Sequence, residues 1–380
     1  MKSKPKFGTY VKNIGGIMKK RILSLALALV MGLSLSACSN KDAASVDSSS
    51  SSAEIQATSA PESSLPETSS SIEDTPHSGS VVRLGSLKGP TTIGLVKLLD
   101  DTKQDKTINS YEFTMGTMPD EIAPKLLSGE LDIIAAPVNM GSVLYNKSNG
   151  KIRMLAINTL GVLYVGAKGA EDIKSIADLK GKTIFATGKG ATPEYVISKL
   201  LSANGLDVNT DVTIEWMSEP TEVLAAVKNT ENAVAVLPQP FMTAAETQVE
   251  GFKSVLDLTA EWDKLGDAGR LVTAGFFTTE EYLENNQKAV DEFLEDYQVS
   301  SAWVTDTENA EEAGKLVEEH DIVKAPIAQK AIPFCNIVNI TGADMKSATE
   351  GYLSVLNEFD PASIGGKLPE ENFYYVKPTK

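Results

Sequence analysis

Histidine and cysteine, the side chains that most often carry nucleophilic or metal chemistry, are scarce in this chain, with two of each in 380 residues. His77 lies in a serine-rich stretch, and His320 ends an acidic segment away from the glycine- and proline-rich turns. Cys335 has no basic neighbour in sequence, which is typical of a core cysteine rather than of a nucleophile. The acidic pairs at 280–281 and 311–312 lie on solvated helical stretches, and no phosphate-binding loop or metal-ligand motif occurs. We therefore expect no enzyme, no metal and no cofactor.

Polar turns recur where predicted strands end and predicted helices begin. Five of them combine Gly or Pro with Thr, Asn, Gln or Lys, at residues 88–92, 116–120, 137–139, 188–192 and 238–241. Proline fits the first position of a helix, and Thr or Asn can cap its exposed N–H groups. In open α/β sheets ligands bind outside the carboxyl ends of the strands, where such N–H groups point outward. A single turn of this kind is also what an ordinary capped helix needs, but five together favour a ligand-binding cleft.

Short apolar runs alternate with amphipathic segments from residue 81 onward, as in α/β proteins. We predict strands at 81–87, 111–115, 131–136, 154–158, 162–165, 183–186, 212–216, 233–237 and 271–277. Helices are predicted at 93–99, 120–127, 140–145, 194–203, 221–227, 279–304 and 310–320. Strands that alternate with helices indicate mostly parallel sheets flanked by helices, with right-handed crossovers.

A second series of strands and helices begins partway along the chain. The predicted strand at 271–277 then returns the chain to the first series. We therefore expect two α/β lobes joined by a two-segment hinge. Lobe I would comprise residues 81–163 and 272–380, and lobe II would comprise residues 164–271.

Charge and composition exclude other classes of protein. The chain carries 35 basic and 51 acidic residues, and residues 81–380 alone hold 27 and 44 of them. A surface this acidic repels phosphate backbones, so general nucleic-acid binding is excluded. Two cysteines cannot build a disulfide-dense scaffold.

The first 38 residues have the composition of a secretory signal. Residues 22–37 carry no charge and follow the basic run Lys19-Lys20-Arg21, and this apolar run is shorter than the roughly 20 residues that span a bilayer. It ends in LSAC at 35–38, which resembles the lipobox of bacterial lipoproteins. That resemblance implies that Cys38 is lipid-modified and anchors the mature chain on the extracytoplasmic face of the cell membrane. Because the signal is already complete from Met18, we expect translation to start there.

Residues 39–80 are predicted to form a disordered tether. Fifteen of these 42 residues are serine and none is aromatic. Such a segment cannot bury enough apolar surface to offset its ordering entropy. The tether would hold a folded domain clear of the membrane and leave it mobile.

Four motifs in the domain carry a family resemblance: LGSLKGPTT at 84–92, LLSGELDIIAAPVN at 126–139, DLKGKTIFATGKGATPEY at 178–195 and VLPQPF at 236–241. With these motifs the chain resembles the periplasmic-binding-protein-like (type II) solute receptors of ABC importers. It is most similar to the nitrate/sulfonate/taurine-type branch, which also includes receptors for thiamine pyrimidine precursors. The resemblance covers residues 81–376 and implies a monomer whose two lobes close on a small molecule. Its partners would be that solute, an ABC permease and the permease's ATPase.

The resemblance also implies which residues contact the solute, because it carries over onto the polar turns and their neighbours. In lobe I these residues are Lys88, Thr91, Thr92, Met115, Thr117, Val138, Asn139 and Thr159. In lobe II they are Lys189, Gly190, Ala191, Thr192, Gln239 and Phe241. Thr and Gln would orient the solute by hydrogen bonds, Met115 and Phe241 would form apolar walls, and the helix starts would add partial positive charge.

The charge of the solute stays open at this point. The domain contains three arginines, Arg83, Arg153 and Arg270, and none lies in a candidate turn, so a bidentate arginine clamp on an anion is not expected. An anion would rely on helix starts, hydroxyls and the two turn lysines. A neutral or cationic heterocycle is equally compatible, and Glu194 and Glu219 would then be candidate contacts.

Two other functions compete with transport. An enzyme on the same fold, similar to pyrimidine-precursor synthases, would need histidine chemistry, and His320 is the one histidine of the domain. A membrane-tethered sensor or interaction protein would bind a ligand without a permease. Genes for a permease and an ATPase beside this one would favour the transporter.

Overall fold

The computed structural model describes residues 79–169, 172–266 and 269–378, all within one compact unit that spans Ile72–Lys380. The predicted signal at 1–38 with Cys38, and the tether with His77, lie outside the described residues, apart from residues 79–80.

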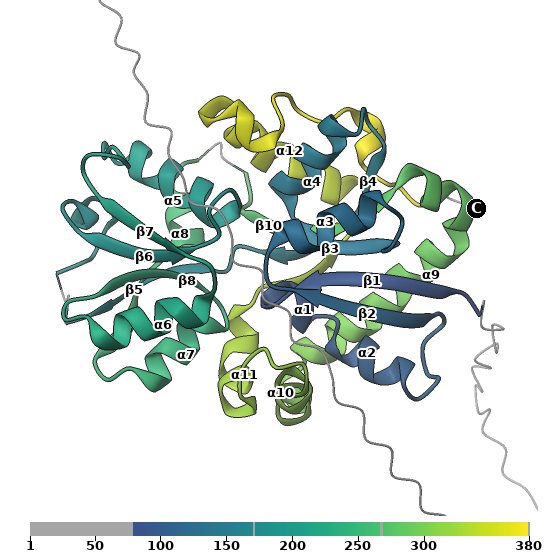
Figure 1. Cartoon of the computed structure of the whole chain (residues 1–380), viewed down its shortest axis with the longest axis horizontal. Coiled ribbons are helices and arrows are strands. Elements are labelled where there is room, and N and C mark those ends of the chain that lie inside the picture. The colour runs from purple at the N-terminus through teal and green to yellow at the C-terminus, as the bar shows by residue number, and fades with distance from the viewer. Residues whose placement is uncertain (1–78, 170–171, 267–268, 379–380) are drawn as a thin grey trace, which may run out of the picture. The chain divides into compact units, whose positions relative to one another are not determined.

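The described residues form two β-sheets flanked by helices (Figure 1). The six-stranded sheet has the order β11-β4-β10-β3-β1-β2. Its strands are β1 Val81–Leu87, β2 Ser110–Gly116, β3 Ile133–Pro137, β4 Ile152–Leu160, β10 Val272–Thr279 and β11 Ile337–Ile340. The five-stranded sheet has the order β7-β6-β8-β5-β9. Its strands are β5 Leu163–Lys168, β6 Thr183–Thr187, β7 Thr213–Met217, β8 Val234–Pro238 and β9 Phe252–Asp257.

Helices cover both faces of each sheet. In chain order they are α1 Pro90–Ile93, α2 Val96–Thr102, α3 Pro119–Leu127, α4 Val138–Lys147, α5 Thr192–Ala203, α6 Pro220–Asn229, α7 Phe241–Gln248, α8 Leu258–Asp263, α9 Glu280–Thr305, α10 Ala310–Glu319, α11 Ala325–Ala331 and α12 Gly342–Phe359. On the six-stranded sheet, α9 packs on one face and α3, α4 and α12 pack on the other. On the five-stranded sheet, α5 and α8 pack opposite α6 and α7. The predicted α/β class with two sheets flanked by helices is therefore confirmed.

The strand directions differ from the prediction, because the sheets are mixed rather than mostly parallel. Parallel pairing holds for β1 with β2 and β3, and for β6 with β7 and β8. The strands through which the chain passes from one sheet to the other are antiparallel to their neighbours, β5 to β8 and β9, and β10 to β3 and β4. Both strands receive the chain from the other sheet, so neither is joined to a neighbour in its own sheet by a crossover helix.

One predicted helix, at 93–99, is broken in two around Gly94, between α1 and α2. A Cβ atom added to Gly94 would lie 2.7 Å from the hydroxyl of Tyr297, which comes from α9. The glycine therefore permits a close approach of two helices, and the chain turns there.

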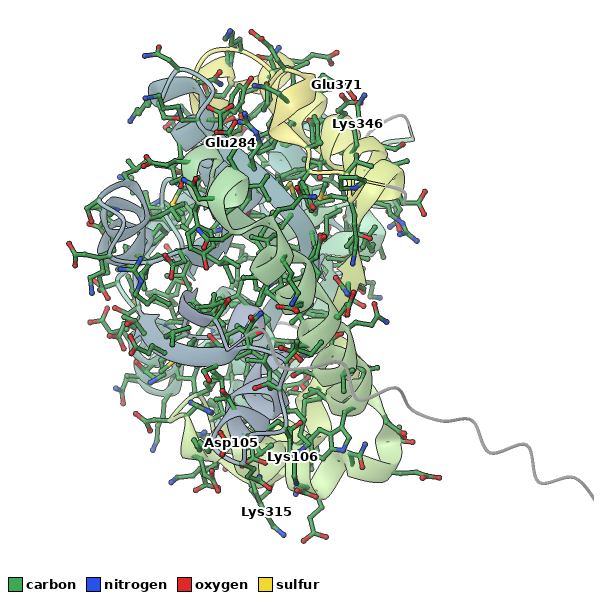
Figure 2. All side chains as sticks on the ribbon, turned by 90° about the vertical axis from the view of Figure 1, so that its right-hand side faces the viewer. Asp105, Lys106, Glu284, Lys315, Lys346 and Glu371 are labelled. Carbon is green, nitrogen blue, oxygen red and sulfur yellow. The ribbon has the colours of Figure 1, made fainter. Side chains whose placement is uncertain are left out.

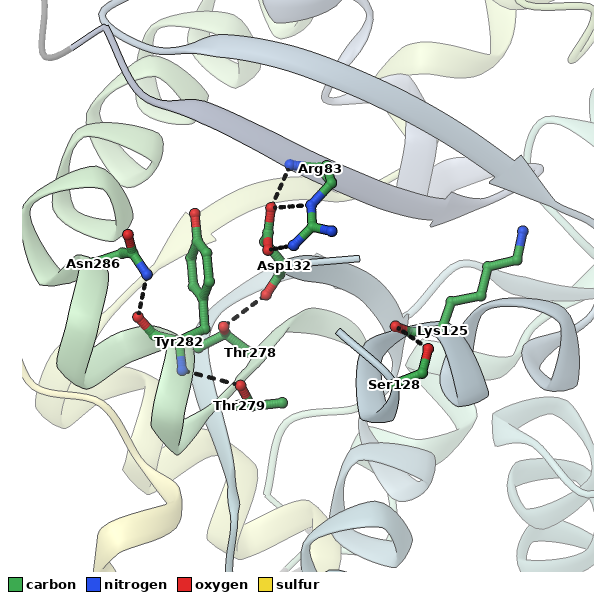
Figure 3. A network of polar contacts seen from close by, with 8 residues as sticks. All are labelled: Arg83, Lys125, Ser128, Asp132, Thr278, Thr279, Tyr282 and Asn286. Carbon is green, nitrogen blue, oxygen red and sulfur yellow. Dashed lines mark hydrogen bonds and ion pairs between the residues drawn. The ribbon is translucent and has the colours of Figure 1, made fainter. Parts of the chain in front are cut away.

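Three neighbouring strands of the six-stranded sheet, β10, β3 and β1, are joined by a polar network around Asp132 (Figure 3). The Asp132 carboxylate accepts hydrogen bonds from Arg83 of β1: from its backbone N–H at 2.8 Å, its Nε at 2.9 Å and its Nη2 at 2.5 Å. The backbone carbonyl of Asp132, directly before β3, accepts a hydrogen bond from Thr278 of β10 at 2.7 Å. The Asp132 side chain is only 3% exposed, whereas that of Arg83 is 43% exposed. This network fixes β1, β3 and β10 relative to one another.

Two charge pairs link the C-terminal segment to helices α12 and α9. Lys346 of α12 pairs with Glu371, and Figure 2 shows both on one face of the molecule. Lys377 pairs with Glu295 of α9 at 2.8 Å. These exposed pairs orient the segment but add little stability.

We predict that Asp132→Asn lowers the free energy of unfolding by about 2 kcal/mol, because a buried acceptor of charge-assisted hydrogen bonds is lost. Denaturation in urea measures this change. Asp120→Asn is the matched control, since Asp120 is exposed in the first turn of α3, and it should shift stability by less than about 0.5 kcal/mol. Equal effects of the two substitutions would contradict the role given to Asp132.

Candidate functional site

A cavity of about 140 Å³ lies where the turns of the two sheets meet. Turns from the six-stranded sheet and from the five-stranded sheet both contribute to its wall. Half of the residues expected to contact a solute line it: Lys88, Thr91, Thr117, Lys189, Ala191, Thr192 and Phe241.

Helix starts surround this cavity. The first residues of α3, α5, α6 and α7 are Pro119, Thr192, Pro220 and Phe241, and all four line it. Proline in the first turn of α3, α5 and α6 lacks the N–H that would otherwise be unpaired, which explains why the chain starts helices there. The remaining N–H groups and the helix dipoles give the cavity partial positive charge.

Three threonine hydroxyls of the cavity wall donate their hydrogen within the protein. Thr91 donates to the carbonyl of Leu87 at 2.7 Å, and Thr192 donates to the carbonyl of Thr273 at 3.2 Å. Thr117 donates to the carboxylate of Glu121 at 2.7 Å, and the hydrogen bonds from Thr117 hold the pKa of Glu121 below its usual value. A hydroxyl has one hydrogen, so in this arrangement these three can only accept hydrogen bonds from a solute.

Lysine supplies the full charges of the cavity. The Lys88 amine lies 3.6 Å from the carboxylate of Asp321, whose side chain is fully exposed. Lys189 is exposed on the loop before α5 and makes no ion pair with the described residues. The described residues that line the cavity include no Asp or Glu. The charged side chains that line the cavity are therefore two lysines, of which Lys88 is paired with Asp321.

Four of the remaining expected residues are turned into the protein interior and do not line the cavity. The Thr92 hydroxyl donates to the carbonyl of Leu87 at 2.6 Å, and the Thr159 hydroxyl lies 3.1 Å from the side-chain oxygen of Asn158. Val138 is fully buried in the core, and Met115 packs against the cluster that contains α10 and α11.

The last three expected residues do not line the cavity either: Gln239 and Asn139 are buried, and Gly190 is exposed. Gln239 is buried, and its side-chain oxygen accepts a hydrogen bond from Thr243 at 2.8 Å. The Asn139 amide donates to the carbonyls of Gly190, at 3.5 Å, and Ser363, at 3.3 Å. The backbone N–H of Gly190 donates to Glu194 at 2.5 Å. Glu194 therefore caps its own loop, and neither it nor Glu219 lines the cavity.

Two buried polar atoms at this junction have no hydrogen-bond partner among the described residues: Asn139 Oδ1 and Thr273 Oγ1. The two carbonyls on the Asn139 NH₂ group fix that amide, so its oxygen is a free acceptor. Thr273 lines the cavity and lies in β10, at a shift in register against β4. Bulges of this kind re-aim side chains beside functional sites.

Thr273 could not be predicted as a cavity residue, because residues 271–277 have the pattern of a regular apolar strand. Met118 and Ser218 also line the cavity and were not expected. Met118 lies within the polar turn at 116–120, and Ser218 lies three residues before the predicted helix at 221–227, where no polar turn was predicted.

The groups available for catalysis lie elsewhere in the described part of the chain. His320 packs edge-to-face on Phe113, with ring centroids 5.8 Å apart, and burial lowers its pKa. Cys335 is fully buried, its thiol donates to the carbonyl of Ala331 at 3.3 Å, and burial raises its pKa far above the ordinary range. Neither residue lines the cavity. No cluster of three or more His, Cys, Asp or Glu suited to a metal ion occurs in the described residues.

Two mixed sheets flanked by helices, with a cavity between their turns, define the type II periplasmic-binding-protein fold. An ABC transporter protein from Parabacteroides distasonis has this fold, with a TM-score of 0.65 and 23% identity over 79% of this chain and 100% of that one. The aliphatic sulphonate binding protein SsuA of Escherichia coli matches with a TM-score of 0.61 and 15% identity, over 80% and 96%. The nitrate-binding protein NrtA of Synechocystis PCC 6803 matches with a TM-score of 0.57 and 14% identity, over 74% and 82%.

The chain belongs to the NMT1-like family, whose model matches residues 120–318. No curated protein matches the chain. Among the described residues, none of the helices has both the length and the apolar character needed to cross a membrane.

We predict that Thr273→Val raises the free energy of unfolding of the ligand-free protein by about 1 kcal/mol, because it removes a buried hydroxyl that has no partner. Thr273→Ser keeps the hydroxyl and is the matched control, which should not be more stable than the native protein. Thermal unfolding measures both variants. A Thr273→Val protein less stable than the native protein would show that this hydroxyl is hydrogen-bonded.

Proposed function

We propose that the protein captures a small solute between its two lobes and delivers it to an ABC importer, without chemistry of its own. The observation that carries this proposal is that turns from both sheets line one cavity. The neighbours described as ABC-transporter, sulphonate-binding and nitrate-binding proteins share the fold and support the same role.

The proposed lobes follow the two sheets. Lobe I would comprise residues 81–163 and 272–380, and lobe II residues 164–271. Support comes from the two places where the chain passes between sheets, from β4 to β5 and from α8 to β10. The hydrogen bonds from Asn139 to Gly190 and from Thr192 to Thr273 would then be contacts between lobes that change when the lobes open.

A small anion is the solute class that the cavity favours. Lys88 and Lys189 line it together with four helix starts, and no carboxylate does. Glu194 and Glu219 do not reach it, which disfavours a cationic heterocycle. The arginines do not line it either, so recognition would depend on N–H groups and the lysines. Two of the structural neighbours are an aliphatic sulphonate binding protein and a nitrate-binding protein.

The N-terminal sequence supports the proposed location. A signal peptide at 1–38 and lipidation of Cys38 would place the domain on the extracytoplasmic face of the cell membrane. The tether at 39–80 would let it reach a permease.

A membrane-tethered sensor that binds the same solute is the second candidate, and the cavity serves it equally well. An enzyme is less well supported, because His320 and Cys335 lie away from the cavity. Co-purification with a permease and an ATPase separates the transporter from the sensor.

We predict that Lys189→Glu weakens the binding of small anions at least tenfold, because it places a negative charge in the cavity wall. Lys253→Glu makes the same charge change at an exposed site on β9, outside the cavity, and should change binding less than twofold. Nitrate and methanesulfonate are suitable anionic probes, with calorimetry as the measurement. A bound solute at a hundredfold excess over Kd also stabilises the native state by about 2.7 kcal/mol. Equal binding by the two variants would place the solute elsewhere.

We predict that Cys38→Ser releases the full chain from the membrane fraction, because the lipid anchor can no longer be attached. Metabolic labelling with a radioactive fatty acid and cell fractionation measure this. Cys335→Ser is the matched control and should leave both the label and the membrane association unchanged. A Cys38→Ser protein that keeps the label would refute the proposed anchor.

A further inference from the structure

Three side chains of the proposed lobe I meet the turn of the proposed lobe II that begins α5. The Asn139 amide donates to the carbonyl of Gly190 at 3.5 Å, and the Thr192 hydroxyl donates to the carbonyl of Thr273 at 3.2 Å. Tyr352 of α12 is fully buried, and its hydroxyl lies beside the Thr192 side chain. Elements α4, β10 and α12 of lobe I therefore all contact the same turn, residues 190–192, of lobe II.

Each of these three lobe I residues carries a buried polar atom that has no hydrogen-bond partner among the described residues. The atoms are Asn139 Oδ1, Thr273 Oγ1 and the hydroxyl oxygen of Tyr352. Thr192 does not satisfy the Tyr352 hydroxyl, since the two side chains lie side by side without hydrogen-bond geometry. A polar group that is buried without a partner has lost its hydrogen bonds to water, so it destabilises the state in which it is buried. Movement of the turn at 190–192 away from lobe I would return these atoms to water.

Tyr352 combines this unpartnered hydroxyl with an aromatic contact that acts in the opposite sense. Its ring packs against that of Trp262 from α8, in the proposed lobe II, with ring centroids 5.7 Å apart. Both side chains are fully buried. The ring therefore stabilises the contact between the lobes, whereas the hydroxyl destabilises it. Phenylalanine at this position would keep the ring and remove the hydroxyl alone.

We propose that Tyr352 is a positioning residue that sets the affinity for the solute without contacting it. Its hydroxyl, together with the free polar atoms of Asn139 and Thr273, destabilises the closed arrangement, in which the α5 turn contacts lobe I. This proposal rests on the proposed solute-binding function. Binding of the solute has to offset the penalty, so affinity is lower than the cavity contacts alone would give. Tyr352 does not line the cavity, so its effect is the same for every solute that the cavity accepts.

Tyr352→Phe tests the proposal in the full chain, with nitrate and methanesulfonate as probes and calorimetry as the measurement. We expect both anions to bind about tenfold more tightly, which corresponds to about 1.4 kcal/mol. Tyr374→Phe is the matched control, because Tyr374 also has a buried hydroxyl without a partner among the described residues, but it packs within lobe I, against Phe373. The control should bind within twofold of the native protein. Both substitutions should raise the free energy of unfolding, so stability alone cannot produce the difference.

The separation of the lobes is a second readout, and it needs no solute. Asp120 and Thr221 are exposed, and each directly follows a proline that lines the cavity, on opposite lobes. Spin labels on Asp120→Cys and Thr221→Cys report this separation by electron paramagnetic resonance. In the solute-free protein, Tyr352→Phe should shift the distribution toward shorter separations, and Tyr374→Phe should leave it unchanged.

Each outcome is decisive. Unchanged affinity in Tyr352→Phe, or an equal gain in Tyr374→Phe, overturns the proposal. Weaker binding by Tyr352→Phe also overturns it, because the hydroxyl would then be hydrogen-bonded in the closed arrangement. An unchanged distribution of separations in Tyr352→Phe overturns it without reference to any solute. Absence of anion binding by all variants, together with a shift toward shorter separations in Tyr352→Phe, overturns the proposed solute class and leaves the role of Tyr352 standing.

Discussion

Hydrogen bonds to Asp132 join three strands whose other ends lead into the cavity. The Asp132 carboxylate accepts three hydrogen bonds from Arg83 of β1, and the backbone carbonyl of the same residue accepts one from Thr278 of β10. These contacts lie near the amino end of β1 and directly before β3, far along both strands from the cavity turns. Because strands are stiff, a register set at one end is carried to the other. The other ends of β1, β3 and β10 carry Lys88, Pro137 and Thr273, and all three residues line the cavity.

Three hydroxyl groups of the cavity wall already donate hydrogen bonds within the protein before a solute binds. The hydroxyls of Thr91, Thr117 and Thr192 already donate within the protein, so donation to a solute falls to the lysines, to helix N–H groups and to Thr273. Pre-oriented N–H groups need no reorganisation on binding, which favours a solute whose charge is negative.

The amino-acid sequence predicts the strands and the cavity turns well, because both depend on local pattern. It predicts the contacts of individual side chains less well. Val138 and Thr92 stand next to Pro137 and Thr91, which line the cavity, yet they are buried in the core, since neighbouring positions on a strand or helix face in different directions. The break at Gly94 depends on Tyr297, about two hundred positions away in sequence, and the register shift that exposes Thr273 to the cavity depends on β4. Strand β11 has four residues and pairs with β4 alone among the described strands. So short a segment shows no hydrophobic periodicity from which a strand could be predicted.

A crystal structure of the protein isolated together with its natural solute tests the central claim most directly. The account predicts electron density for one small molecule in the cavity, with its charged group near Lys189 and the first turn of α5. A solute bound elsewhere on the domain, with the cavity between the two sheets empty, would contradict it.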